Sequence, residues 1–376
     1  MAGMHSSPVD ATKRNGRLAL IAAGGTGGHM FPAQALAEVL LAEGWRVKLS
    51  TDIRGARYAD GFPEAVTRTI MTSASTARGG LMARAAAPGK IGIGIGRAVA
   101  DLRRDRPAIV VGFGGYPAIP AMAAATILGI PRMIHEQNGV MGRVNRLFAR
   151  RVNRVACGTW PTALPAGVKG IHTGNPVRQA VLDRAGAPYT APQDESGPLN
   201  LLVIGGSQGS RLISACTTEA VAALPEAMRS RLSISHQARP EDVETVRAAY
   251  AAASVNAEVA PFFSDVPERM AGAQLVICRS GASTVAELTV IGRPAILIPY
   301  AAAAGNHQVA NAQPMVDHDA ALMLPESVLD ACSLARDMRS ILGDPARAAT
   351  KAGNALSLGR PDAARRLYDL VTELVT

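Results

Sequence analysis

Residues 18–29 read LALIAAGGTGGH, and this stretch decides the fold. The six apolar residues Leu18–Ala23 predict a strand that is buried on both faces, and a glycine-rich loop follows them. We expect a helix from about Pro32 to Gly44, because proline suits a first helical turn and glycine often ends a helix. A strand, a glycine loop and a helix in this order are typical of a Rossmann-like unit.

The same unit occurs a second time in the chain. Residues 199–209 read LNLLVIGGSQG, which is again an apolar strand followed by a glycine loop. Other expected strands are Trp45–Ser50, Ala108–Phe113, Arg132–His135, Val152–Cys157, Leu232–His236, Leu275–Cys278 and Ala295–Ile298. Strands that alternate with helices predict parallel sheets with right-handed crossovers. We therefore expect an α/β protein with two Rossmann-like, doubly wound domains facing a cleft.

A change of composition separates the two halves. Residues 184–198 are polar and rich in glycine and proline, which predicts a loop close to a domain boundary. We assign one Rossmann-like domain to residues 1–178 and a second to residues 179–358. Residues 359–376 have apolar positions at helical spacing, so we expect a closing helix that packs back on the N-terminal domain.

Composition excludes several classes of protein. The chain has 376 residues, 48% of them hydrophobic, which is enough for two cores. Its net charge of +9 suits anionic lipid or a phosphate-rich ligand, and nucleic acid is not expected because basic residues do not alternate with aromatic ones. The four cysteines form no CxxC pair, so we expect no metal site, no cofactor and a reducing compartment. Residues 1–17 do not read as a secretory signal, and no apolar run is long enough to span a bilayer.

The glycine loops are candidate phosphate sites. Backbone N–H groups at the start of a helix can approach phosphate oxygens closely where the loop is made of glycine. Neither loop carries the Lys-Ser/Thr of a Walker A motif, and the first lacks the third glycine of a dinucleotide fingerprint. Glycines that only permit a tight turn are the alternative, but two loops at matching places favour phosphate binding.

Further motifs follow these loops in a fixed order. They are Gly24–His29, Gly114–Tyr116, His135–Asn138, Gly174–Arg178, Gly205–Gly209 and Arg279–Glu287. This set resembles the MurG family of peptidoglycan N-acetylglucosaminyltransferases over Leu18 to Asn311. The resemblance implies a GT-B fold and an inverting transfer of N-acetylglucosamine from UDP-N-acetylglucosamine to the muramyl 4-hydroxyl of undecaprenyl-linked lipid I, which forms lipid II. It also implies a peripheral protein on the cytoplasmic face of the cell membrane, with residues 1–178 as the acceptor- and membrane-side domain and residues 179–358 as the UDP-sugar-binding domain.

Side-chain chemistry and the resemblance together give a donor site. Glu287 is expected to bind the ribose hydroxyls, Ser207 the pyrophosphate, and Arg178 the leaving UDP. The amides of Asn138 and Gln308 suit sugar hydroxyls. The remaining expected donor contacts are Thr26, Gly27, Gly28, Phe263 (through its backbone, to uracil), Ala282, Ser283 and Thr284. Without their neighbouring motifs, Glu287 and Arg178 would be ordinary surface charges and Phe263 a core residue.

The acceptor is expected at Gly24, Gly25 and His29 of the first glycine loop and at Tyr116 of the Gly114–Tyr116 motif. An attacking hydroxyl needs a base, and a helix N-terminus favours the neutral form of His29 that a base requires. His29 as a binder of the acceptor diphosphate is an equal alternative. Glu136 is the rival base.

Two stretches depart from a simple interpretation. The Ala301–His307 loop has no acidic residue, although relatives often have acidic residues there, so its donor contacts are left open. The Asp317-His318-Asp319 sequence resembles a DxD metal motif, but we interpret it as a polar turn away from the glycine loops.

Residues 77–106 are both basic and apolar, which suits attachment to anionic lipid. Arg78, Arg84, Lys90 and Arg97 alternate there with apolar residues. Glycines at 92, 94 and 96 are expected to weaken any helix in this stretch, and a core helix with a solvated basic face is the alternative.

Two other functions remain to be distinguished. A UDP-N-acetylglucosamine 2-epimerase-like enzyme would share the scaffold but would turn over the nucleotide sugar alone. A membrane-associated binding protein would keep the donor pocket without catalysis.

Overall fold

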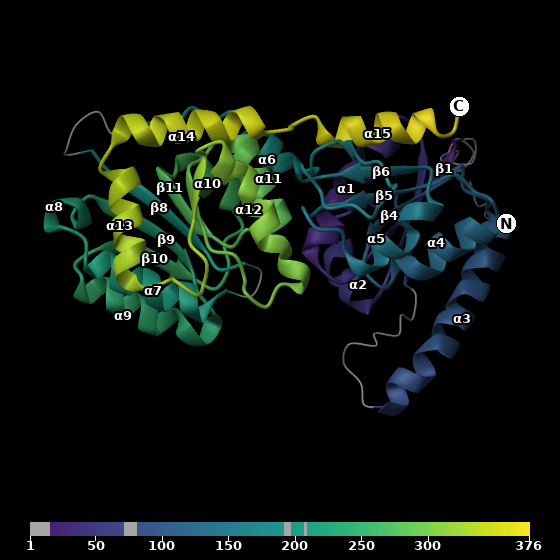
Figure 1. Cartoon of the computed structure of the whole chain (residues 1–376), viewed down its shortest axis with the longest axis horizontal. Helices are drawn as coiled ribbons and strands as arrows, with labels where there is room; N and C mark the ends of the chain where they lie inside the picture. The colour runs from purple at the N-terminus through teal and green to yellow at the C-terminus, as the bar shows by residue number, and fades with distance from the viewer. Residues whose placement is uncertain (1–15, 71–80, 192–196, 207–208) are drawn as a thin grey trace, which may run out of the picture.

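The computed structural model describes residues 16–70, 81–191, 197–206 and 209–376. Within these ranges the chain forms a seven-stranded and a six-stranded sheet, both parallel throughout (Figure 1). The first sheet has the order β3-β2-β1-β4-β5-β6-β7 and the second β10-β9-β8-β11-β12-β13. The prediction of two doubly wound α/β domains is confirmed.

The strands and helices have the following bounds. The strands are β1 (Leu18–Ala23), β2 (Arg46–Thr51), β3 (Thr67–Ile70), β4 (Ile109–Gly114), β5 (Arg132–Glu136), β6 (Arg154–Cys157), β7 (Ile171–His172), β8 (Leu199–Ile204), β9 (Leu232–Gln237), β10 (Asn256–Ala260), β11 (Leu275–Cys278), β12 (Ala295–Leu297) and β13 (Ala321–Met323). The helices of the first half are α1 (Gly27–Ala42), α2 (Ile53–Ala59), α3 (Leu81–Arg104), α4 (Ala118–Ile127), α5 (Arg143–Phe148) and α6 (Gln179–Leu182). Those of the second half are α7 (Arg211–Ala222), α8 (Glu226–Arg229), α9 (Val243–Ala252), α10 (Val266–Gly272), α11 (Ala282–Ile291), α12 (His307–Asp317), α13 (Ala331–Leu342), α14 (Pro345–Leu358) and α15 (Ala363–Glu373).

The strand order places both glycine loops at equivalent points. β1 lies between β2 and β4, and β8 lies between β9 and β11, so the order reverses at the strand that precedes each glycine loop. Ligands of open α/β sheets bind at such a switch point, beyond the carboxyl ends of the strands. The topology therefore directs attention to the ends of β1 and β8.

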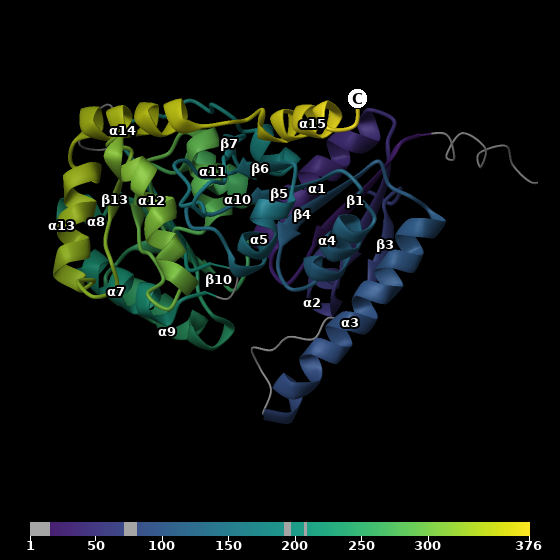
Figure 2. The ribbon, with the colours of Figure 1, turned by 45° about the vertical axis from the view of Figure 1, so that its right-hand side comes forward.

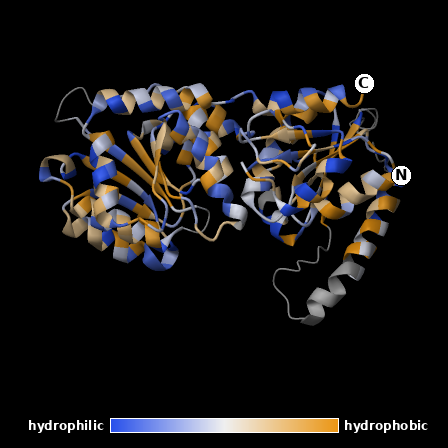
Figure 3. Cartoon of the chain, in the orientation of Figure 1, coloured by the Kyte–Doolittle hydropathy of each residue, from blue (hydrophilic) through white to orange (hydrophobic). Residues whose placement is uncertain are grey.

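β1 shows why these sheets are covered on both faces. All six of its residues are buried, as the apolar run predicts. Ala19 and Ile21 pack in a cluster with α1 and α15, whereas Leu20 and Ala22 pack with α4 on the other face. Figure 3 shows the same pattern for both domains, with apolar residues concentrated in the sheets and polar ones on the outer helix surfaces.

The end of the chain crosses from the second domain to the first. α14 lies along the C-terminal domain and α15 along the N-terminal one (Figures 1 and 2). Leu367 and Val371 are fully buried in the core cluster that contains α1. Arg365 forms an ion pair with Glu43 at the end of α1, and Arg154 pairs with Glu373 at 2.5 Å. Helix α15 thus adds to the core of the N-terminal domain.

Two expectations about helices were wrong. α1 begins at Gly27 rather than near Pro32, so the second half of the glycine loop is the first turn of the helix and Pro32 lies inside it. α3 is continuous through Gly92–Gly96, because Ala98 and Leu102 anchor it in the core and Gly94 packs beside the ring of Pro120 in α4. The side chains of Arg84 and Lys90, and all of Arg78, lie outside the described residues.

One histidine in each domain is buried and neutral. His236 has its two ring nitrogens 2.7 Å from Tyr250 Oη and 3.0 Å from Ser214 Oγ, and burial lowers its pKa to about 4. His135 lies 3.2 Å from the Gly174 carbonyl oxygen through Nε2, and burial likewise lowers its pKa to about 4. Both are satisfied core histidines.

These histidines predict a loss of stability in acid. Their pKa values are lower in the folded than in the unfolded chain, so between about pH 6.5 and pH 4 the unfolded state binds protons that the folded state cannot. We expect each to lower the free energy of unfolding by roughly 2 kcal/mol at pH 5 relative to pH 7. Urea unfolding at the two pH values measures this; equal stability at both would contradict it, and the exposed His318→Gln variant should leave the difference unchanged.

Candidate active site

The first glycine loop follows β1 and touches the loop that follows β4. A Cβ on Gly24 would meet the ring of Pro117 at 2.6 Å, and a Cβ on Gly115 would meet the Gly24 carbonyl oxygen at 2.5 Å. Only residues without a side chain fit this approach, and Gly115 also has a φ of +78°. The structure therefore brings together two predicted motifs, Gly24–His29 and Gly114–Tyr116.

His29 lies half-buried in the first turn of α1. Its Nδ1 is 3.1 Å from the Gly24 carbonyl oxygen and 3.4 Å from Thr26 Oγ1. A carbonyl only accepts hydrogen bonds, so Nδ1 donates and the lone pair of the neutral ring is on Nε2. Burial lowers the pKa of His29; Glu136 and the bond to Gly24 oppose this effect, and His307 adds to it. The ring is therefore neutral near pH 7, with Nε2 able to accept a proton.

Glu136, the last residue of β5, is buried and fully engaged. Its Oε1 accepts the backbone and side-chain N–H groups of Asn138 at 3.0 and 3.1 Å. Its Oε2 accepts the N–H of Gly142 and Nδ2 of Asn145, both at 2.9 Å. The carboxylate thus organises the loop after β5. His29, by contrast, has an Nε2 for which the described residues supply no hydrogen-bond partner.

The predicted donor residues surround the start of α11. Ala282, Ser283 and Thr284 form its first turn, at the carboxyl end of β11. Glu287 follows one turn later and pairs with Arg178, with 3.6 Å between Oε1 and Nη2. Burial raises the pKa of Glu287, and Arg178 opposes this effect. The Arg178 guanidinium also lies 4.7 Å above the ring of Phe31, so Arg178 connects the donor helix to α1 of the other domain.

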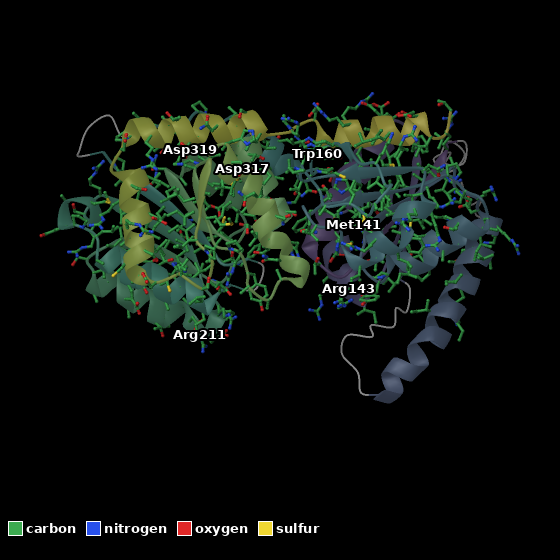
Figure 4. The ribbon with its side chains drawn as sticks, viewed as in Figure 1. Met141, Arg143, Trp160, Arg211, Asp317 and Asp319 are labelled. Carbon is green, nitrogen blue, oxygen red and sulfur yellow. The ribbon has the colours of Figure 1, made fainter. Side chains whose placement is uncertain are left out.

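Several buried polar atoms at the domain junction have no hydrogen-bond partner among the described residues. They are Arg178 Nε, Ser283 Oγ, Gln137 Oε1 and both ends of the Asn175 amide. Such atoms are nearly always paired in proteins, so we expect ordered water or a polar ligand at each of them. Asn175 and Trp160 line a cavity of about 90 Å³ between the domains, and Figure 4 shows Trp160 at this junction.

An acidic side chain from outside the Ala301–His307 loop binds to this loop. Glu326 Oε2 accepts a backbone N–H of this loop at 3.1 Å, and its Oε1 pairs with Arg279 at 2.6 Å. Gln308, just after the loop, is the second residue of α12. The sequence interpretation missed Glu326, because nothing near it in the sequence marks its contact with this loop.

Three other predicted residues have defined surroundings, whereas Ser207 lies outside the described residues. Tyr116 is partly buried against the N-terminal core. Phe263 is buried after β10. Asn138 faces the other domain, with its Oδ1 3.2 Å from Asn311 Nδ2. The roles predicted for these residues stay predictions.

The Asp317-His318-Asp319 sequence is a turn. Asp317 ends α12, Asp319 has a φ of +52° and forms an ion pair with the buried Lys351 of α14. Figure 4 places both aspartates on the side of the C-terminal domain where α14 lies. Within the described residues no group of three or more His, Cys, Asp or Glu side chains could hold a metal ion.

Comparison with known proteins agrees with this geometry. Residues 19–157 match the glycosyltransferase family 28 N-terminal domain, and residues 200–367 match the family 28 C-terminal domain. A UDP-N-acetylglucosamine–N-acetylmuramyl-(pentapeptide) pyrophosphoryl-undecaprenol N-acetylglucosamine transferase of Paramagnetospirillum magneticum is 48% identical, over 95% of this chain and 97% of the relative. The protein of the same name from Sinorhizobium fredii is 46% identical over 95% of each chain.

Solved structures give the same result. The crystal structure of Acinetobacter baumannii MurG has a TM-score of 0.77 and 31% identity, and the match covers 95% of this chain and 99% of that one. A putative UDP-N-acetylglucosamine 2-epimerase from Listeria monocytogenes, at 13% identity and a TM-score of 0.69 over 95% and 96% of the chains, shares the fold alone. The chain belongs to the MurG family of N-acetylglucosamine transferases, within glycosyltransferase family 28.

Proposed function

We propose that this chain transfers N-acetylglucosamine from UDP-N-acetylglucosamine to lipid I, the undecaprenyl-pyrophosphoryl N-acetylmuramyl-pentapeptide, and so forms lipid II for peptidoglycan synthesis. One observation carries the proposal: a glycine loop lies at the switch point of each sheet, with His29 at the first and the Glu287–Arg178 pair beside the second domain's α11. Two phosphate-type loops suit a reaction in which donor and acceptor both carry a diphosphate.

The reaction exchanges one bond at the anomeric carbon of the donor sugar. The muramyl 4-hydroxyl oxygen forms a bond to this carbon, its proton passes to His29 Nε2, and the bond to the UDP oxygen breaks with its electron pair leaving on the phosphate. Arg178 stabilises the charge that develops there. Attack opposite the leaving group inverts the configuration of the anomeric carbon.

The other site residues divide between the two substrates. On the donor we place Glu287 at the ribose, Ser207 at the pyrophosphate, and Asn138 with Gln308 at the sugar. The remaining donor contacts are proposed at Thr26, Gly27, Gly28, Phe263, Ala282, Ser283 and Thr284, and the acceptor contacts at Gly24, Gly25 and Tyr116. The engagement of Glu136 within its own loop supports His29 as the base.

The proposal is tested by the acceptor dependence of UDP release. We expect UDP to be released from UDP-N-acetylglucosamine only when a lipid I analogue is present. An epimerase would turn over the nucleotide sugar without acceptor, and a binding protein would release no UDP under either condition. Likeness in fold alone, at 13% identity, gives the epimerase alternative little support.

We place the membrane contact at the edge of the N-terminal domain that includes α3 and α5. Ile93 and Leu147 are 61% and 51% exposed there, and Arg97, Arg143 and Arg146 are exposed as well. Figure 3 shows apolar residues along the described end of α3, and Figure 4 shows Arg143 at the side of the domain from which α3 projects. Exposed apolar and basic residues together suit an anionic lipid surface. No helix of the described residues is long and apolar enough to cross a membrane.

Peripheral attachment at the cytoplasmic face predicts a specific loss of vesicle binding. Replacing Arg97, Arg143 and Arg146 by glutamine should weaken binding to anionic vesicles by roughly two orders of magnitude, at about 1 kcal/mol per basic residue. Activity on a soluble acceptor analogue should stay unchanged. The triple change Arg247→Gln, Arg336→Gln and Arg347→Gln, at exposed residues of the C-terminal domain, is the charge-matched control. Vesicle binding that is insensitive both to salt and to the triple change would place the attachment elsewhere.

A further inference from the structure

A buried amide in the middle of α12 joins the two domains. Asn311 is fully buried, and its Oδ1 accepts the backbone N–H of Gly139 at 2.8 Å. Its Nδ2 donates to Asn138 Oδ1 at 3.2 Å and to the Ser280 carbonyl oxygen at 3.0 Å. Both ends of the amide are thus engaged, and its partners belong to both domains. Buried hydrogen bonds of this kind specify one arrangement of the groups that they join.

The Asn138–Gly139 turn of the N-terminal domain packs directly against α12 beside Asn311. A Cβ on Gly139 would be 2.9 Å from the Cβ of Ala310 and 3.0 Å from its carbonyl oxygen. Such a distance leaves no room for a side chain, so glycine is required for the approach. The contact between the Asn138–Gly139 turn and α12 is therefore close packing as well as hydrogen bonding.

In the N-terminal domain, hydrogen bonds connect Asn311 to the residues next to the proposed base, His29. Asn138 is held between two partners, because its Oδ1 accepts from Asn311 and its backbone and side-chain N–H groups donate to Glu136. Glu136 in turn acts electrostatically on His29 and opposes the lowering of its pKa by burial. A displacement of Asn138 would therefore shift Glu136 and change its electrostatic effect on His29.

In the C-terminal domain, Asn311 is connected to the proposed donor residues. Gln308 lies one turn earlier on α12. The carbonyl oxygen of Gln308 accepts from Ser280 Oγ at 2.8 Å, and Ser280 lies just before the α11 turn that begins at Ala282. One hydrogen-bonded network thus runs from Gln308 and Ser280 through Asn311 to Asn138 and Glu136.

We propose that Asn311 is a positioning residue, which fixes the orientation of the Asn138 amide and couples a donor bound on the C-terminal domain to the loop that holds Glu136. The proposal rests on the proposed function, since it concerns how the two substrates are aligned. Without Nδ2 of Asn311, Asn138 Oδ1 loses its partner and the amide can turn. Small displacements of this kind are costly to a reaction between two bound substrates, with losses of about 100-fold for 1 Å.

The test compares Asn311→Leu, which keeps the side-chain volume, with Gly139→Ala, which separates the turn from α12 and leaves Asn311 intact. Both should lower kcat about 10- to 100-fold. The Kd of UDP by titration calorimetry should change much less than kcat, because neither change removes a proposed UDP contact. The Tm should fall in both variants, because Asn311→Leu leaves buried polar groups unpaired and Gly139→Ala crowds Ala310, so the assays are run well below the Tm of each variant. Gln313→Leu is the matched control, since it removes an amide from the same helix that, among the described residues, bonds to Asp317 within α12.

Hydrogen exchange at the Gly139 amide gives a readout that does not require turnover. Adding UDP-N-acetylglucosamine should slow this exchange in the wild type and have no effect in Asn311→Leu. A wild-type kcat in Asn311→Leu, equal losses of kcat and UDP affinity, or exchange that does not respond to the donor would each overturn the proposal. A wild-type protein that transfers nothing to lipid I would refute the proposed function instead, and the exchange experiment would still decide the role of Asn311.

Discussion

Replacing His29 by alanine is expected to lower kcat by about two to four orders of magnitude, the usual contribution of a general base. The reason is geometric: Nδ1 is fixed by the Gly24 carbonyl oxygen, so the proton-accepting lone pair is on Nε2. The Kd of UDP should remain at its wild-type value, because His29 is not among the proposed donor contacts. Steady-state kinetics with each substrate varied in turn measures both effects.

The pH profile distinguishes the base from a binder. Burial lowers the pKa of His29 below 6.5, so the acidic limb of kcat should lie below pH 6.5 and be absent from the alanine variant. His318→Ala is the control, since that exposed histidine caps α12 through the Pro314 carbonyl oxygen. A His29→Ala enzyme with a higher acceptor KM and an unchanged kcat would make His29 a diphosphate binder. Wild-type kcat and acceptor KM together would exclude both roles.

Replacing Glu287 by alanine is expected to raise the donor KM about 100-fold, the effect of losing two hydrogen bonds to a charged acceptor. The change also removes the partner of Arg178, which then bears an uncompensated charge in the empty site. UDP should lose affinity in parallel, as titration calorimetry would show. Glu268→Gln is the matched control, because Glu268 is an exposed carboxylate of the same domain that pairs with Arg184.

The ionisation of Glu287 adds a second test of this assignment. Burial raises its pKa above the usual value of 4.5, so this carboxylate becomes protonated at a higher pH than an exposed carboxylate does. UDP affinity should therefore weaken in acid in the wild type but not in Glu287→Ala. Unchanged UDP affinity in Glu287→Ala would remove Glu287 from the donor site.

The fold could be predicted from sequence because its determinants are local. Leu18–Ala23 and the glycines after it specify a buried strand and a tight turn within a dozen residues, and the Leu199–Gly209 stretch does the same. The ends of helices were harder to predict. The preference of proline for a first helical turn placed the start of a helix at Pro32, whereas α1 begins at Gly27. In α3, packing against α4 outweighs the low helix propensity of Gly92–Gly96.

The site was predictable only where a motif marks it. The sequence singled out His29, Glu136 and Glu287 because each belongs to a motif, but it did not show that Glu136 is engaged by its own loop. Asn311 contacts Gly139 across 172 positions of the chain, and no local pattern predicts such a contact. The contact between Phe31 and Arg178 could not be predicted either, because the two residues lie at opposite ends of the N-terminal domain's sequence.

The central claim is that this enzyme joins one N-acetylglucosamine to lipid I. It is tested most directly by incubating the protein with UDP-N-acetylglucosamine labelled in the sugar, with and without a lipid I analogue, and analysing the lipid and nucleotide products. We predict that the label moves to the lipid only when the analogue is present, as one β-linked N-acetylhexosamine on the muramyl residue for each UDP released. Label that stays on the nucleotide sugar, or that appears in an epimeric sugar without any acceptor, would contradict the claim.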